Sequence, residues 1–137
     1  MRLVVADASA LVEYLLRTER SEPVRMAVEA PDTDLHVPAL CDVEVTAAVR
    51  RALLGGVLDE RRAIDAVEDY LDLSLTTHGH TALLHRIIAL RRNLSVYDAA
   101  YVALAEALGA ALLTADRSLE RAVRQQQLVE VVASDGR

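Results

Sequence analysis

The stretch SVYDAAYVALAEALGAALLTADRSL, residues 95–119, contains a helix, a turn and a strand in immediate succession. Ser95 is a favourable N-cap residue, and Asp98 stands three residues later at the acidic position of a capping box. Gly109 favours a helix end because glycine adopts positive φ at little cost. Ala110–Thr114 is an apolar run of the kind found in buried parallel strands. The stretch therefore predicts a capped helix followed directly by a buried strand.

The rest of the sequence continues this alternation of short apolar strands and helices. Further strands are expected at Leu3–Ala6, Leu35–Val37, Leu73–Thr76 and Leu128–Val132. Further helices are expected at Ser9–Arg17, Ser21–Ala30, Leu40–Leu54, Asp59–Leu71, Gly79–Arg92 and Leu119–Gln127. Such alternation is typical of a parallel sheet with helices on both faces. We therefore predict an α/β fold with three α/β/α layers around a short, mainly parallel sheet, over residues 1–133, with a tail at 134–137.

Two of the predicted helices should form an αα-hairpin. They flank the pair Gly55-Gly56, which ends the first helix and leaves only a short loop before Asp59, the expected cap of the second. Ile64, Val67 and Leu71 share one face of that second helix, which is the pattern of an amphipathic helix.

Composition limits the function classes. The chain has 137 residues, of which 53% are apolar, so one domain with a substantial core is expected. Its formal charge of −6 disfavours a protein that coats nucleic acid by general electrostatics. An enzyme that meets nucleic acid through a metal ion and a few arginines stays compatible with this charge, and all 15 Lys and Arg residues are arginine.

The single cysteine indicates the cellular setting. Cys41 cannot form an internal disulfide and stands among apolar residues, so we expect a buried thiol and a cytoplasmic protein. The longest apolar stretch, Ala99–Ala115, is short for a membrane span, contains Glu106 and is divided by Gly109. We therefore expect no membrane association.

Two acidic residues come directly after predicted strands. Asp7 follows the first strand, and Asp116 follows the strand at Ala110–Thr114. Each could simply cap the helix that comes next. In parallel α/β sheets, however, ligands bind at the carboxyl ends of the strands, where both residues lie. They are therefore candidate site residues as well as candidate caps.

Two more acids are candidates for the same sheet edge. Asp98 leads a helix face made of apolar residues, and a carboxylate at the start of a buried face needs a partner. Glu44 lies in the helix that follows the second strand, but Asp42 is nearby, and periodicity does not distinguish the two.

A cluster of carboxylates has a specific chemical meaning. Two of them about 4 Å apart repel by roughly 4 kcal/mol at an effective dielectric constant of 20. Such a cluster either raises its pKa values or binds a cation. Ligands that are all oxygen favour Mg²⁺ or Mn²⁺, and these ions support phosphodiester hydrolysis.

Three local motifs resemble those of the PIN-domain family, in particular the VapC-type toxins of toxin–antitoxin pairs. They are VVADASALVEYLL from Val4, PALCDVEVTAAVRR from Pro38, and LSVYDAAYVALAEALGAALLTAD from Leu94. The resemblance implies a PIN-like fold and a Mg²⁺-dependent endoribonuclease, with Mn²⁺ as a substitute ion.

The resemblance also implies roles for individual residues. The acidic, metal-binding and catalytic set would be Asp7, Glu44, Asp98 and Asp116. Glu44 is preferred to Asp42 here because the family spaces this acid six residues after the proline. The hydroxyls of Ser9 and Thr114 would hold a carboxylate, a water molecule or a phosphate.

The family further implies an RNA substrate, a homodimer and a cognate VapB-type antitoxin. The alternative is a catalytically degenerate PIN-like domain that acts as a dimeric protein- or RNA-binding module. A receiver domain is disfavoured because the chain has no lysine, and a haloacid-dehalogenase-type phosphatase because Ser9 replaces the second Asp of its motif.

Several other residues give weaker signals. His78 and His80 are expected in an exposed loop rather than a metal site, and His36 indicates nothing by itself. Contacts with RNA phosphates or with the antitoxin are open alternatives for two arginine pairs, Arg50-Arg51 and Arg91-Arg92. Tyr97 could stack on a base or pack in the core.

Overall fold

A four-stranded sheet forms the centre of the computed structural model, which describes residues 1–17 and 21–132. The strands are β1 (Arg2–Ala6), β2 (Thr33–Pro38), β3 (Leu75–His78) and β4 (Ala111–Leu113). Their order is β3-β2-β1-β4, and every pair is parallel. The predicted tail at 134–137 lies outside the described residues.

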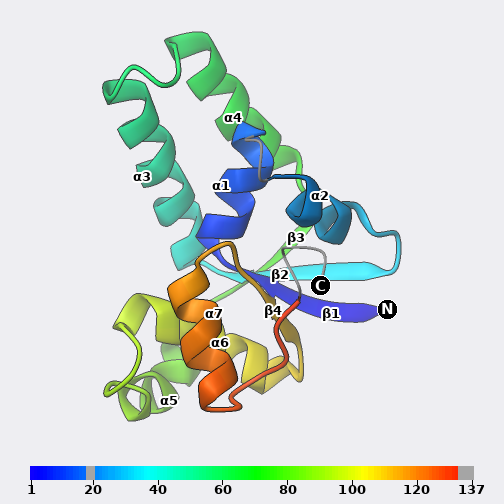
Figure 1. Ribbon diagram of the computed structural model, residues 1–137, viewed down its shortest axis with the longest axis vertical. Helices are drawn as coiled ribbons and strands as arrows, with labels where there is room; N and C mark the ends of the chain where they lie inside the picture. Colours follow the sequence, from blue (N-terminus) through cyan, green and yellow to red (C-terminus); the bar gives the residue numbers. More distant parts are fainter. Residues whose placement is uncertain (18–20, 133–137) are drawn as a thin grey trace.

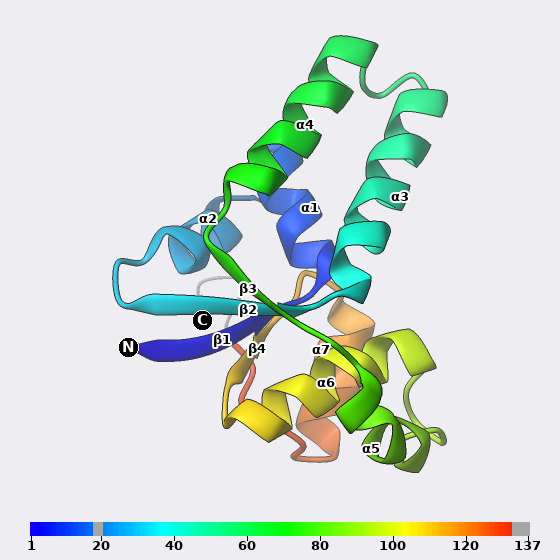
Figure 2. The same cartoon turned by 180° about the vertical axis from the view of Figure 1, so that it is seen from behind.

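Helices cover both faces of this sheet. They are α1 (Ala8–Leu16), α2 (Ser21–Glu29), α3 (Leu40–Leu54), α4 (Glu60–Asp72), α5 (Leu84–Ala89), α6 (Val96–Leu108) and α7 (Arg117–Gln125), with a short 3₁₀ turn, η1 (Thr81–Leu83), before α5. Helices α1 to α4 lie on one side of the sheet and α5 to α7 on the other, as both views show (Figures 1 and 2). The predicted three-layer α/β/α fold is confirmed. Within the described residues, no helix has the length and apolar character needed to cross a membrane.

Helix α6 is the most deeply buried helix, as its sequence predicts. Its seven residues Ala99–Ala105 are all buried, and four of them are alanine, which lets the helix approach the strands closely. The Ser95 hydroxyl accepts a hydrogen bond from the Asp98 amide at 3.1 Å. Gly109 ends the helix in the left-handed region at φ 64°. Both predicted ends of this helix are therefore confirmed.

The predicted last strand is wrong as an extended element. Among the described residues after α7, only Val131 forms a bridge, parallel to Leu112 of β4. The Leu112 amide donates to Glu130 and its carbonyl accepts from Val132, each at 2.8 Å. The segment therefore touches the sheet edge at one point, because it meets only the three-residue strand β4.

The predicted helix at Gly79–Arg92 is much shorter in the structure. It begins with η1, continues as α5 and ends at Ala89. The preceding strand is also displaced toward the C-terminus, since Leu75 rather than Leu73 starts it, opposite Leu35 of β2.

The histidines are not the exposed, independent side chains that the sequence suggested. His36 is 9% exposed, and its Nδ1 lies 2.8 Å from Nε2 of His78. Its Nε2 lies 3.0 Å from a carboxylate oxygen of Asp34. His80 accepts a hydrogen bond from the amide of Leu40 at 3.0 Å, at the first residue of α3. These contacts join β2, β3 and α3.

The αα-hairpin is confirmed, but its contact face differs from the apolar stripe of α4. Ala63 and Ala66 are the buried residues of α4, and they pack with Val49 and Leu58 in a small second core. Ile64 and Leu71 are 54% and 67% exposed. Val67, the third residue of the predicted stripe, is partly buried against this second core. The prediction of an apolar contact face is therefore right for Val67 and wrong for Ile64 and Leu71.

Candidate active site

Asp7 forms the centre of the site at the junction of β1 and α1. It is 4% exposed, and its Oδ1 accepts hydrogen bonds from the Ala10 amide at 2.9 Å and the Ser9 hydroxyl at 2.7 Å. Its Oδ2 accepts from the Thr114 hydroxyl at 2.5 Å. Asp7 is thus the N-cap of α1, but Thr114 comes from a different part of the chain, which capping alone does not require.

The two predicted hydroxyls connect the segments that follow β1 and β4. The Ser9 hydroxyl lies 3.2 Å from that of Thr114 and accepts the Ala115 amide at 3.0 Å. The Thr114 hydroxyl accepts the Asp116 amide at 3.0 Å. Because each hydroxyl both donates and accepts, the pair fixes Asp7 and Asp116 relative to each other.

Asp116 lies at the exposed start of α7. Its Oδ1 accepts the amides of Ser118 at 2.9 Å and Leu119 at 3.2 Å, so it too is an N-cap. Its Oδ2 accepts no hydrogen bond from the described residues and is available to a ligand.

Glu44, on α3, points toward the same edge of the sheet, where β1 and β4 end. Its Oε1 accepts a hydrogen bond from the Tyr101 hydroxyl of α6 at 2.6 Å. Asp42 accepts instead from Tyr70 of α4, also at 2.6 Å. The structure therefore separates the two acids: Glu44 faces α6, and Asp42 faces α4. The contact with Tyr101 was not predicted, although Tyr101 follows Asp98 by three residues on the same helix face.

Asp98 joins the other acids from the first turn of α6. Burial raises its pKa most, and the nearby carboxylates of Asp116 and Glu44 raise it further, against a lowering effect of Ser95. Burial likewise raises the pKa of Asp7 from 3.8 to about 6, and Asp98 adds to that increase. The structure thus places Asp98 within electrostatic reach of each of the other three predicted acids.

The donor set fits a hard divalent cation at an open site. In the part of the chain that the structure describes, no arginine or histidine forms an ion pair with any of the four acids. No three His, Cys, Asp or Glu side chains among the same residues are arranged to hold a metal ion by themselves. The donor atoms present are nevertheless carboxylate and hydroxyl oxygens, and Mg²⁺ is usually held by one or two carboxylates together with several water molecules.

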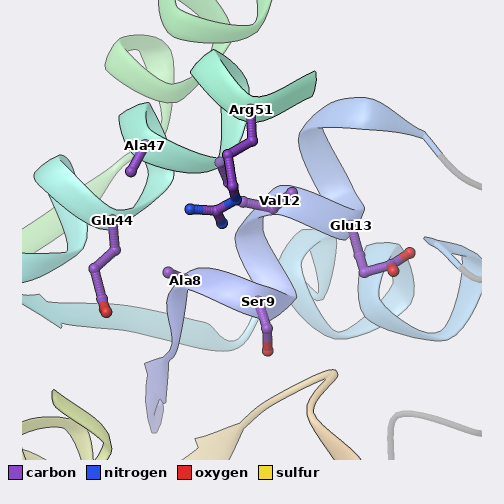
Figure 3. A pocket seen from close by; sticks show the side chains of 8 residues that line it. Ala8, Ser9, Val12, Glu13, Glu44, Ala47 and Arg51 are labelled. Atoms are coloured by element: carbon purple, nitrogen blue, oxygen red, sulfur yellow. The ribbon is translucent and has the colours of Figure 1, made fainter. Parts of the chain in front are cut away.

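A groove leads from the acids along α1 and α3. Its volume is about 410 Å³. It is lined by Ala8, Ser9, Val12, Glu13, Glu44, Ala47, Ala48 and Arg51. Figure 3 shows Arg51 reaching from α3 over Val12, with Glu44 and Ser9 toward one end of the groove. The sequence alone left the role of Arg51 open, and the structure places this residue in the groove.

Comparison with known proteins shows the family. Residues 4–125 match the sequence profile of the PIN domain. The chain belongs to the PIN-domain family. This PIN domain is 39% identical over 133 residues to Ribonuclease VapC9 of Mycobacterium tuberculosis, covering 95% of this chain and 98% of that protein. It is 40% identical over 120 residues to Ribonuclease VapC3 of the same species, covering 87% and 86%. It is thus a VapC-type PIN domain.

A solved structure shows the same fold. The crystal structure of VapBC2 from Rickettsia felis, bound to a DNA fragment from its promoter, matches this PIN domain with a TM-score of 0.68. The match covers 94% of this chain and 96% of that chain at 12% identity. This match shows the fold, and the family profile and the relatives of 39% and 40% identity confirm the predicted resemblance to VapC-type PIN domains.

Proposed function

We propose that this VapC-type PIN domain is a metal-dependent endoribonuclease and the toxin of a type II toxin–antitoxin pair. Its relatives of 39% and 40% identity are named ribonucleases. Asp7, Glu44, Asp98 and Asp116 hold Mg²⁺, for which Mn²⁺ can substitute, and Ser9 and Thr114 orient the acids.

One observation carries this proposal. The four acids are far apart in sequence, yet the carboxylates of Asp116 and Glu44 both raise the pKa of Asp98, which in turn raises that of Asp7. A protein gains nothing in stability by placing carboxylates together without a cation, because they repel each other. A divalent ion removes this repulsion.

The acidic residues and the hydroxyl groups around them have different roles in the proposed reaction. A divalent ion held by these acids would supply charge neutralisation at the phosphate and would favour ionisation of a water molecule. The hydroxyls of Ser9 and Thr114 hold Asp7 in one orientation through hydrogen bonds of 2.7 and 2.5 Å. Tyr101 holds Glu44 in the same way. Such fixed ligands need little rearrangement when substrate binds.

The proposed partners follow from the same relationships. The Rickettsia felis structure, VapBC2, holds promoter DNA as well as protein, and its name combines VapB with VapC. We propose a cognate VapB-type antitoxin for this chain, single-stranded or looped RNA as substrate, and a homodimer.

The test is cleavage of structured RNA with Mg²⁺ or Mn²⁺ by the wild type and by an Asp98→Asn variant. We expect cleavage only by the wild type, abolished by EDTA and restored by added Mn²⁺. Thermal unfolding gives a second readout, since Mn²⁺ should raise the melting temperature of the wild type more than that of the variant.

Equal cleavage by both proteins would show that a contaminating nuclease acts instead. RNA binding without cleavage, and no stabilisation by Mn²⁺, would support the catalytically degenerate binding module.

A further inference from the structure

We propose that Arg51 binds a phosphate of the RNA strand next to the phosphodiester that is cleaved, so that the groove between α1 and α3 is a substrate subsite. This inference rests on the proposed ribonuclease function and adds to it the path of the strand and the residue that holds it.

The groove is continuous with the acidic site. Glu44 and Ser9 line the groove, and the Ser9 hydroxyl donates to Asp7. A strand whose scissile phosphate lies at the acids therefore has this groove as an adjoining surface. Among the described residues that line the groove, Arg51 is the only lysine or arginine.

Helix geometry explains why Arg51 reaches into the groove. Glu44, Ala47, Ala48 and Arg51 follow the i, i+3, i+4, i+7 spacing, so they share one face of α3. Arg51 is displaced from Glu44 by about 10 Å along the helix axis, at 1.5 Å per residue. Side chains on a helix lean toward its N-terminus, which tilts Arg51 back toward Glu44. Figure 3 shows the guanidinium over Ala8 and Val12 in this orientation.

Small side chains leave room for a ligand beneath the guanidinium. Ala8, Ala47 and Ala48 line the groove together with Val12. This part of the lining is apolar, and it suits a ribose or the face of a base better than a second charged group. The charged group of the ligand would then meet Arg51, which offers a planar set of N–H donors to phosphate oxygens.

Arg51 is not occupied by the protein itself. Arg2, Arg25, Arg86 and Arg124 each pair with a carboxylate. Arg51 pairs with none of the described carboxylates. On a chain with a net charge of −6, such a cation beside the acids is a favourable place for a polyanion to be held.

The experiment compares Arg51→Gln with Arg50→Gln. Arg50 is the adjacent exposed residue of α3 and does not line the groove, so it is a matched control. Cleavage of a short single-stranded RNA is measured with Mn²⁺ at several salt concentrations. We expect Arg51→Gln to raise KM about tenfold or more with little change in kcat, and Arg50→Gln to change neither substantially.

Salt dependence identifies the phosphate contact. The slope of log affinity against log salt concentration should fall by about 0.7 in Arg51→Gln, the value for one lost contact with a single strand. Arg51→Lys should keep the slope and recover part of the affinity, because it keeps the charge but not the planar donors. Melting temperatures should stay unchanged in all three variants, since both arginines are exposed.

The outcomes separate this inference from the proposed function. If the wild type cleaves RNA and Arg51→Gln matches it in KM and salt slope, Arg51 is not a phosphate ligand although the enzyme is a ribonuclease. If only binding of the antitoxin is weakened, the groove is a protein site and the inference is wrong. If the wild type neither binds nor cleaves RNA, the proposed function and this inference both fail.

Discussion

Asp7 is a carboxylate in a position that favours its neutral form. The surrounding protein raises its pKa from 3.8 to about 6, mainly by burial, and three hydrogen bonds only partly offset this. In the metal-free protein, folding therefore becomes less favourable as pH rises from 4 to 6, because the unfolded chain ionises Asp7 first. The residue that organises the site is also one that destabilises the fold when no cation is bound.

Asp7→Asn should therefore stabilise the metal-free protein at neutral pH. The pKa change from 3.8 to about 6 corresponds to about 3 kcal/mol, so we expect an increase of about 1–3 kcal/mol in the free energy of unfolding at pH 7. The difference in the free energy of unfolding should nearly vanish at pH 4, where Asp7 of the folded wild type is protonated and neutral, as Asn is in the variant. Urea denaturation in EDTA from pH 4 to 8 measures this, and a variant that is less stable at pH 7 than the wild type contradicts it.

Tyr101→Phe tests whether Glu44 must be held. The substitution removes the 2.6 Å hydrogen bond and should cost about 1 kcal/mol of stability. We expect about a tenfold slower cleavage at saturating Mn²⁺, because Glu44 becomes free to rotate. Tyr70→Phe is the control, since it removes a bond of the same length to Asp42. Equal loss of activity in the two variants would show a general effect of stability.

At the scale of the helix, α6 connects folding to the site. Its N-cap orders the turn that carries Asp98, and its apolar body fixes that turn against the sheet. Local signals were sufficient to predict this element, because Ser95 and Gly109 act through bonds within their own turns. The bounds of α3 were also predicted, because Pro38 precedes the helix and Gly55-Gly56 follows it.

Ser95→Ala should weaken the metal site as well as the helix. Losing an N-cap costs about 1 kcal/mol, and the first turn of α6 becomes less ordered. The stabilisation by Mn²⁺ should then require a severalfold higher ion concentration. Asp59→Ala is the control, since Asp59 caps α4 through the Arg62 amide at 2.8 Å, away from the acids. Thermal unfolding across a Mn²⁺ titration measures both, and an identical titration curve for Ser95→Ala and the wild type refutes the link.

Elements that depend on distant contacts were predicted less well. His36 and His78 approach each other only because β2 and β3 pair, and no local pattern reveals this. The stripe of Ile64 and Leu71 on α4 shows the same limit, since periodicity identifies an apolar face but not what it packs against. Among the site contacts, Tyr101 with Glu44 was missed because it joins positions 57 residues apart.

At the scale of the whole molecule, the acids come together because the sheet is parallel. Asp7 and Asp116 follow adjacent strands that end at one edge, as the strand alternation predicted. Apolar residues also stay exposed on the helix layer formed by α5, α6 and α7. Leu84 and Ile88 of α5 are 55% and 56% exposed, and Tyr97 at the start of α6 is 60% exposed. Exposed apolar groups of this kind are typical of interfaces between proteins.

We therefore expect a homodimer that depends on α5. Analytical ultracentrifugation should give twice the chain mass of 14.9 kDa for the wild type, and Ile88→Asp should give a monomer, because a buried charge without a partner is costly. Ile64→Asp, with 54% exposure on the αα-hairpin, should stay a dimer. A monomeric wild type, or a dimer that only Ile64→Asp disrupts, overturns this expectation.

The bond between Thr114 and Asp7 has a consequence for how the protein is made. The two residues are 107 positions apart, and β1 lies between an early strand and the last one. During synthesis, the segment that holds Asp7 in place leaves the ribosome near the end of the chain, after Glu44 and Asp98. A nascent chain therefore has an incomplete acidic site until the segment that carries Thr114 and Asp116 has been translated. The order of the strands therefore delays assembly of the candidate site until three of its four acids, Asp7, Glu44 and Asp98, have been synthesised.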